Sequence, residues 1–162
     1  MLIRVFLLFI CFLFQIGIRD NVLLFGFAPD FLIIGLVMTV KKNNLLDGVI
    51  LGAGCGLLYD LMAYSYFGFG LFTLTLAGFL TAFFKKHVFT DNIFSNMLIA
   101  LLVSLINGII SLLTINYFYV PVSFTRELVR VVLPVAVYTS VLLSIPLFFY
   151  HSFSGKLKKV FG

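Results

Sequence analysis

The sequence predicts an all-α integral membrane protein, a single transmembrane domain over residues 1–162 built as a bundle of six helices. Of the 162 residues, 62% are hydrophobic and 10% are charged, and the mean hydropathy is +1.20. A soluble domain of this length could not hide so much apolar surface from water. No segment alternates polar and apolar residues in short strand-like pieces, which argues against a transmembrane barrel.

The first two helices are expected over residues 2–18 and 30–40. The first is an apolar run whose only charge is Arg4. No small-residue cleavage pattern follows it, so we interpret it as a membrane helix and not as a removed signal peptide. The second begins at Pro29 and Asp30, because proline suits a helix start and an acid in the first turn meets the positive end of the helix dipole.

Two interpretations of the stretch before the second helix remain open. Residues 19–21 carry two charges and interrupt the apolar sequence. In the first interpretation, residues 22–28 form an interfacial or re-entrant piece ahead of a short helix. Alternatively, one kinked span covers residues 22–40.

The third and fourth helices are expected over residues 45–63 and 67–84. From residue 48 to residue 84 the only charge is Asp60, and this length is too great for one span of about 20 residues. Residues 64–70 are rich in tyrosine and glycine, which suit a turn at the membrane interface.

The last two helices are expected over residues 93–116 and 124–150. Pro134 and Pro146 fall inside the second of them. Proline removes a backbone donor and kinks a helix, so neighbouring groups must satisfy the freed carbonyls.

The basic residues predict the orientation of the bundle. With six spans and a cytoplasmic N-terminus, both termini lie in the cytoplasm and basic residues are concentrated on that side, as the positive-inside rule requires. This distribution accounts for the net charge of +5 without a nucleic-acid partner. The inner residues are Arg4, Lys41, Lys42, Lys85, Lys86, Lys156, Lys158 and Lys159, and the outer ones are Arg19, Arg126 and Arg130.

A glycine stripe on the third helix is the main candidate for a helix-packing or partner interface. Gly48, Gly52, Gly56 and Asp60 recur every four residues and therefore share one broad face of a helix. Small residues at this spacing let a second transmembrane helix approach closely. A carboxylate within a span is costly, so Asp60 is expected to face protein or water, with an arginine as one possible partner.

Two further groups of polar residues are secondary candidates. One lies on a single face of the fifth helix, where it either holds helices together or forms the wall of a polar cavity. The other is an arginine pair at the start of the sixth helix, either an interfacial charge cluster or an outer docking point for a partner. The residues are Ser104, Asn107, Gly108 and Ser111, and then Arg126 and Arg130.

The sequence does not predict an enzyme, a metal site or a cofactor. His87 and His151 lack a second ligand at metal-binding spacing. The glycines of residues 52–56 lie within an apolar span, with no preceding strand and no following lysine, so they do not form a phosphate-binding loop. No nucleophile has a plausible base nearby.

Several of these motifs together resemble the rod shape-determining protein MreD family of bacteria. The resemblance rests on Ala-Pro-Asp-Phe at residues 28–31, the glycine segment 48–56, Gly-Leu-Leu-Tyr-Asp-Leu at residues 56–61, and Gly68. It implies that Pro29 and Asp30 belong, with the glycine stripe and Asp60, to the helix-packing or partner interface. It implies a non-enzymatic scaffold of the cell-elongation machinery in the bacterial cytoplasmic (inner) membrane, supporting rod-shape control and peptidoglycan synthesis. The implied partners are an MreC-like bitopic membrane protein, MreB, RodA and its transpeptidase, and the lipid bilayer.

The same resemblance implies a fold similar to the six-helix substrate-binding subunits of energy-coupling-factor transporters. The alternative function is therefore a small-molecule-binding or transport subunit of that type. Such a subunit needs a polar pocket of ligand size, for which the sequence offers Asp60, Asn107 and a few serines. The scaffold is the leading hypothesis.

Overall fold

The computed structural model describes residues 2–17, 28–41, 44–62, 68–87, 92–118 and 123–161. These residues form helices joined by short connections, with no strand among them, which confirms the all-α class. The stretch before the second helix falls largely on residues 18–27, outside the described residues. The elements are α1 (Leu2–Gly17), α2 (Phe31–Thr39), α3 (Leu45–Met62), α4 (Phe69–His87), α5 (Ile93–Phe118), α6 (Phe124–Glu127), the π-helical turn η2 (Leu128–Val132) and α7 (Leu133–Phe161).

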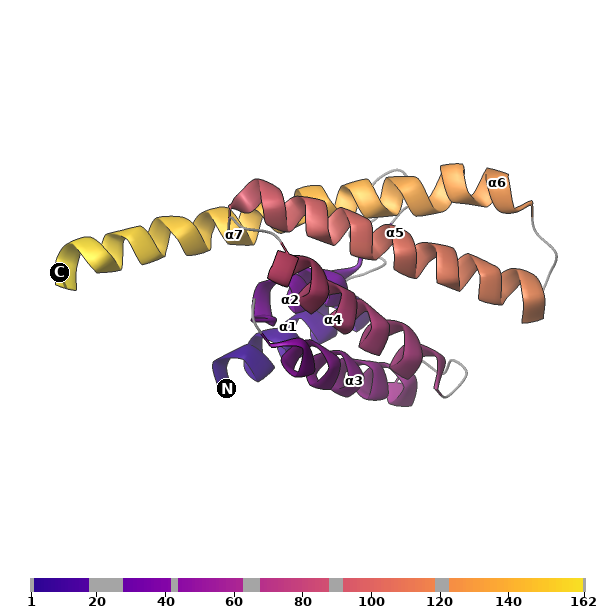
Figure 1. Cartoon of the computed structure of the whole chain (residues 1–162), viewed down its shortest axis with the longest axis horizontal. Coiled ribbons are helices and arrows are strands. Elements are labelled where there is room, and N and C mark those ends of the chain that lie inside the picture. The colour runs from indigo at the N-terminus through magenta and orange to yellow at the C-terminus, as the bar shows by residue number, and fades with distance from the viewer. Residues whose placement is uncertain are drawn as a thin grey trace.

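Four stretches within the described residues are long and apolar enough to cross a membrane. They are Leu45–Met62, Phe69–His87, Ile93–Thr114 and Phe124–Phe148. In Figure 1, α1 to α4 form a cluster, and α5 and α7 lie side by side along one flank of it. The C-terminal part of α7 projects beyond the other helices.

The short helix α2 lies at the centre of the fold. Its nine residues span roughly 13 Å, less than half of a hydrocarbon core of about 30 Å. Seven of the nine are buried, and α2 contacts α1, α3, α4, α5 and α7. A helix that is apolar on every side is stable only when it is surrounded. Here the surroundings are other helices of the same chain.

The last expected helix requires a correction. In place of one α-helix over residues 124–150, a π-helical turn separates α6 from α7, and α7 continues to Phe161. Within this turn the Leu133 N–H donates to the Leu128 carbonyl, five residues back. Pro134 follows directly and has no N–H, and in a regular α-helix its ring would collide with the carbonyl four residues earlier. The widened turn relieves that collision.

Candidate functional site

The glycine stripe of α3 packs directly against the backbone of α4. A Cβ at Gly56 would lie 2.6 Å from the Gly70 carbonyl oxygen, closer than two such atoms can approach. A Cβ at Gly52 would collide with the Leu74 carbonyl in the same way, and one at Gly48 with the Gly78 carbonyl. The contacted residues of α4 therefore also recur every four positions, in reverse order, as antiparallel helices require.

Because α4 covers this stripe, it is a packing surface within the chain. Gly78 closes the ladder from the other side, since a Cβ there would collide with the Gly48 carbonyl. Gly54 lies on the opposite, exposed face of α3, and a Cβ there would have no neighbouring atom within 4 Å. The stripe, and not glycine content in general, sets the distance between the two helices.

Asp60 ends the stripe and caps the N-terminus of α4. Its carboxylate accepts hydrogen bonds from the backbone N–H groups of Gly68 (2.9 Å), Gly70 (2.8 Å) and Leu71 (2.9 Å). The side chain is nearly enclosed, with the residue only 5% exposed. The first N–H groups of a helix have no partner within it and carry partial positive charge, so a carboxylate is well matched to them.

The groups that donate to Asp60 are backbone N–H groups of α4 and its cap, and not the arginine that the sequence offered as a partner. Three backbone N–H groups compensate for the desolvation of the carboxylate. A Cβ at Gly70 would collide with Asp60 Oδ1 and lie 2.9 Å from Tyr59 Cδ1, so this contact needs a glycine on α4. The Asp60 cap and the glycine ladder thus fix the same pair of helices.

Pro29 and Asp30 hold the N-terminal end of α2. Pro29 is fully buried, and Asp30 is the N-cap residue, with its Oδ1 accepting from the Ile33 N–H at 3.3 Å. Two other helices contribute at this end. The Asp30 N–H donates to Thr139 Oγ1 of α7 at 3.0 Å, and the Phe31 N–H donates to Gln15 Oε1 of α1 at 2.9 Å.

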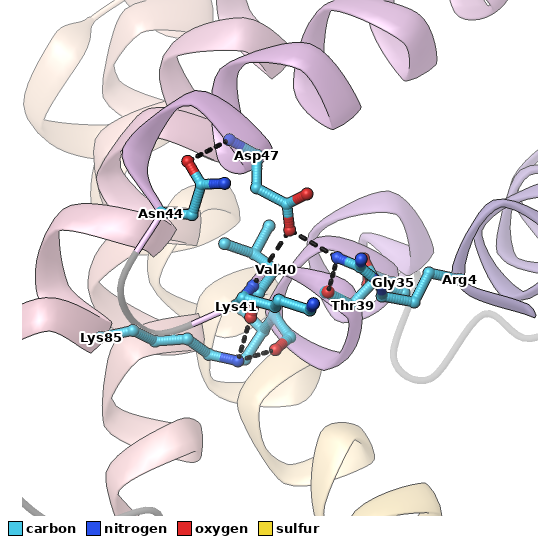
Figure 2. A network of polar contacts seen from close by, with 9 residues as sticks. Arg4, Gly35, Thr39, Val40, Lys41, Asn44, Asp47 and Lys85 are labelled. Atoms are coloured by element: carbon cyan, nitrogen blue, oxygen red, sulfur yellow. Dashed lines mark hydrogen bonds and ion pairs between the residues drawn. The ribbon is translucent and has the colours of Figure 1, made fainter. Parts of the chain in front are cut away.

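The C-terminal end of α2 is held by the basic side chains in Figure 2. Lys85 Nζ, from α4, donates to the carbonyls of Val37 and Val40, the latter at 3.0 Å. Arg4 of α1 donates to the Thr39 carbonyl at 3.5 Å and forms an ion pair with Asp47 of α3. Four helices therefore meet at the last turn of α2, where cations suit the negative end of the dipole.

Replacing Lys85 with methionine should destabilise the protein by about 1–2 kcal/mol, because it removes charge-assisted hydrogen bonds to the carbonyls of two buried residues, Val37 and Val40. Thermal unfolding of the purified protein measures this loss. The neighbouring Lys86 is exposed, so Lys86→Met is the matched control and should leave the unfolding temperature nearly unchanged. Equal effects of the two substitutions would show that Lys85 acts only through general charge.

The secondary candidates on α5 face two different surroundings, the π-helical turn η2 and a cavity beside α4. Gly108 faces the π-helical turn, since a Cβ there would lie 2.6 Å from Val132 Cγ1. Ser104 is buried. Asn107 and Ser111 line a cavity beside α4, and Asn107 Oδ1 is buried without a hydrogen-bond partner among the described residues. The face expected to hold helices together thus also forms part of a cavity wall.

The arginine pair near α6 is accessible. Arg126 and Arg130 are both exposed, and neither has an ion-pair partner within the described part of the chain. They lie one turn apart, on α6 and in η2 respectively. In the same part of the chain, no three His, Cys, Asp or Glu side chains are grouped so that they could hold a metal ion.

Comparison with known proteins connects this architecture to one family. The family model for rod shape-determining protein MreD matches residues 1–153 of the chain. No curated protein matches, and no solved structure does. The match spans α1 to α6, η2 and most of α7, including the glycine ladder, the Asp60 cap and both ends of α2. The chain therefore belongs to the rod shape-determining protein MreD family.

Proposed function

We propose that this protein is a non-enzymatic membrane scaffold of the bacterial cell-elongation machinery. In this role it binds an MreC-like bitopic protein and supports rod-shape control and peptidoglycan synthesis, with MreB, RodA and its transpeptidase in the same assembly. The observation that carries the proposal is the family match over residues 1–153.

The internal packing supports a scaffold. The glycine ladder and the Asp60 cap join α3 to α4, and side chains from α1, α4 and α7 hold both ends of α2. A body fixed in this way can present the same outer surface to a partner throughout its working cycle. We further propose a six-span layout that resembles the substrate-binding subunits of energy-coupling-factor transporters. In this layout α1 is a fifth span and α2 is a short, buried sixth element.

The proposed orientation places both termini in the cytoplasm of an inner-membrane protein. Arg4, Lys41 and Lys85 gather at one end of the helix cluster, around Asp47 and the last turn of α2. The positive-inside rule assigns that end to the cytoplasm. Arg126 and Arg130 then face the outside, where a bitopic partner would carry its extracytoplasmic domain.

The exposed arginine pair is the proposed outer contact with the partner. The double charge reversal Arg126→Glu, Arg130→Glu should lower co-purification of an MreC-like protein severalfold. The new glutamates would repel the acidic groups of the partner with which the arginines pair in this proposal. Lys86→Glu, a charge reversal at the proposed cytoplasmic end, should leave the yield unchanged. The same membranes test the orientation, since a cysteine at position 126 should react with an impermeant reagent and one at position 86 should not. Wild-type yield with both arginines reversed would remove this contact from the proposal.

The alternative, a small-molecule-binding subunit, retains one supporting observation. Asn107 and Ser111 border a cavity of about 200 Å³ that also reaches α1, α2, α3 and α4. Loss of uptake or binding of a vitamin-like solute, with an intact partner complex, would favour this alternative over the scaffold.

A further inference from the structure

The rod formed by α6, η2 and α7, which runs along one edge of the molecule in Figure 1, carries exposed apolar side chains on its outward face. Within the described residues, α7 packs on α5 and α2, in addition to η2 at its own start. On the inward face, Val132 packs against Gly108 of α5, and Thr139 accepts a hydrogen bond from the Asp30 N–H at the start of α2. The outward face carries five exposed apolar residues at four-residue intervals, which we call the valine stripe. They are Val129, Leu133, Val137, Val141 and Ile145.

The valine stripe spans most of the membrane thickness. From Val129 to Ile145 it rises about 24 Å, against a hydrocarbon core of about 30 Å. The exposed Arg126 and Arg130 lie at its N-terminal end on the same rod, and the one acid there, Glu127, leaves that end with a net positive charge. In the proposed orientation this is the outer end. A continuous surface therefore runs from the arginine pair at the outer boundary into the membrane.

The composition of the valine stripe differs from that of the exposed faces of α3 and α4. Four of its five residues are β-branched, whereas the exposed large apolar side chains are mostly leucine on α3 and all phenylalanine on α4. A β-branched side chain has one strongly preferred rotamer in a helix, so it loses little freedom when a second helix packs against it. A ridge at four-residue spacing is also the pattern that fits into the groove of another helix. The valine stripe is therefore suited to a protein neighbour.

We infer that the valine stripe binds the single transmembrane helix of the bitopic partner, as the continuation within the membrane of the contact proposed for the arginine pair. This inference rests on the proposed function. A bitopic chain crosses the membrane once, and its spanning segment must be a helix because lipid cannot satisfy backbone polar groups. The helix that fits has small residues at four-residue spacing to receive the valine ridge, and acidic residues just outside the membrane for Arg126 and Arg130. A second copy of this chain fits poorly, because copies share one orientation and would bring their arginine pairs together.

Photo-crosslinking in native membranes tests the inference. A benzophenone amino acid in place of Val137 should crosslink to the transmembrane helix of the MreC-like protein, identified by mass spectrometry of the product. The same probe in place of Ile50, which is β-branched and 62% exposed on α3, should not. A crosslink from position 137 only to a second copy of this chain would assign the stripe to self-association and overturn the inference.

A bulky substitution measures how much the stripe contributes to binding. Val137→Trp should lower the recovery of co-purified MreC-like protein by about tenfold, because the larger ring keeps the two helices apart. Ile50→Trp is the matched control and should leave the recovery unchanged. Both positions are exposed, so both variants should keep the wild-type Tm when the partner is absent.

The outcomes separate this inference from the proposed function. Wild-type recovery with Val137→Trp, together with no partner crosslink from position 137, would refute the stripe as the interface and leave the proposed scaffold standing. Absence of the MreC-like protein from wild-type preparations would instead count against the proposed function, and the inference would fail with it.

Discussion

Alanine at Gly52 should destabilise the protein by about 1–3 kcal/mol, the usual cost of inserting a methyl group into a tightly packed core. The added Cβ would collide with the Leu74 carbonyl and lie 3.0 Å from Thr75 Cα. Both atoms belong to the backbone of α4, so no side-chain rotation can relieve the contact. The helices must separate, and the contacts along the ladder weaken together. Thermal or denaturant unfolding in a fixed lipid or detergent measures the change.

Gly54 provides a matched control on the same helix. It is exposed, and a Cβ there meets no atom within 4 Å. Gly54→Ala should therefore be neutral or stabilising by up to about 1 kcal/mol, since alanine favours a helix more than glycine does. Opposite signs for one substitution two residues apart would establish the ladder. Equal tolerance of alanine at both positions would contradict the packing of α3 on α4.

Asparagine at Asp60 should destabilise the protein by on the order of 2 kcal/mol or more, because buried N–H donors lose a charged acceptor. The amide has one oxygen where the carboxylate uses two to accept from three N–H groups. The NH₂ group of the asparagine is itself a donor and would face the backbone N–H donors of α4, to which it cannot form a hydrogen bond. Transfer free energies alone predict the opposite effect on stability, because a neutral side chain costs less to place in a membrane than a charged one. The hydrogen bonds that Asp60 accepts reverse that expectation.

Amide hydrogen exchange separates this loss from a general effect on folding. In Asp60→Asn, the amides of Gly70 and Leu71 should exchange faster, since the first turn of α4 loses its cap. Glu127→Gln makes the same chemical change on α6, at a side chain that makes no cap hydrogen bond, and should leave these amides unaffected. Unchanged protection of Gly70 in Asp60→Asn would exclude the capping role.

The helical class and the packing stripe were accessible from sequence because both depend on local patterns. Apolar run lengths separate the helices, and the four-residue spacing of Gly48, Gly52 and Gly56 places them on one face whatever the partner is. The helix that fills this face could not be identified, because any small-residue stripe accepts any neighbour. The donors of Asp60 were also hidden, since backbone N–H groups have no sequence signature.

The centre of the fold was the hardest part to foresee. A nine-residue apolar segment gives no periodicity that distinguishes a buried helix from an interfacial one. The side chains of Gln15 and Thr139 accept hydrogen bonds from the N–H groups at the start of α2. They come from helices at opposite ends of the sequence. Pro134 indicated a disturbance of the last helix, but not that it would take the form of a π-helical turn whose Val132 packs against Gly108.

The shortness of α2 constrains how the protein reaches its native state. A segment of this length cannot enter the bilayer as an independent span, and lipid offers no partner for the polar groups at either end of the helix. Those partners are supplied by α1, α4 and α7, the last of which is synthesised long after α2 leaves the ribosome. Membrane insertion and tertiary folding are therefore one event for this helix, completed only when the C-terminal part of the chain arrives.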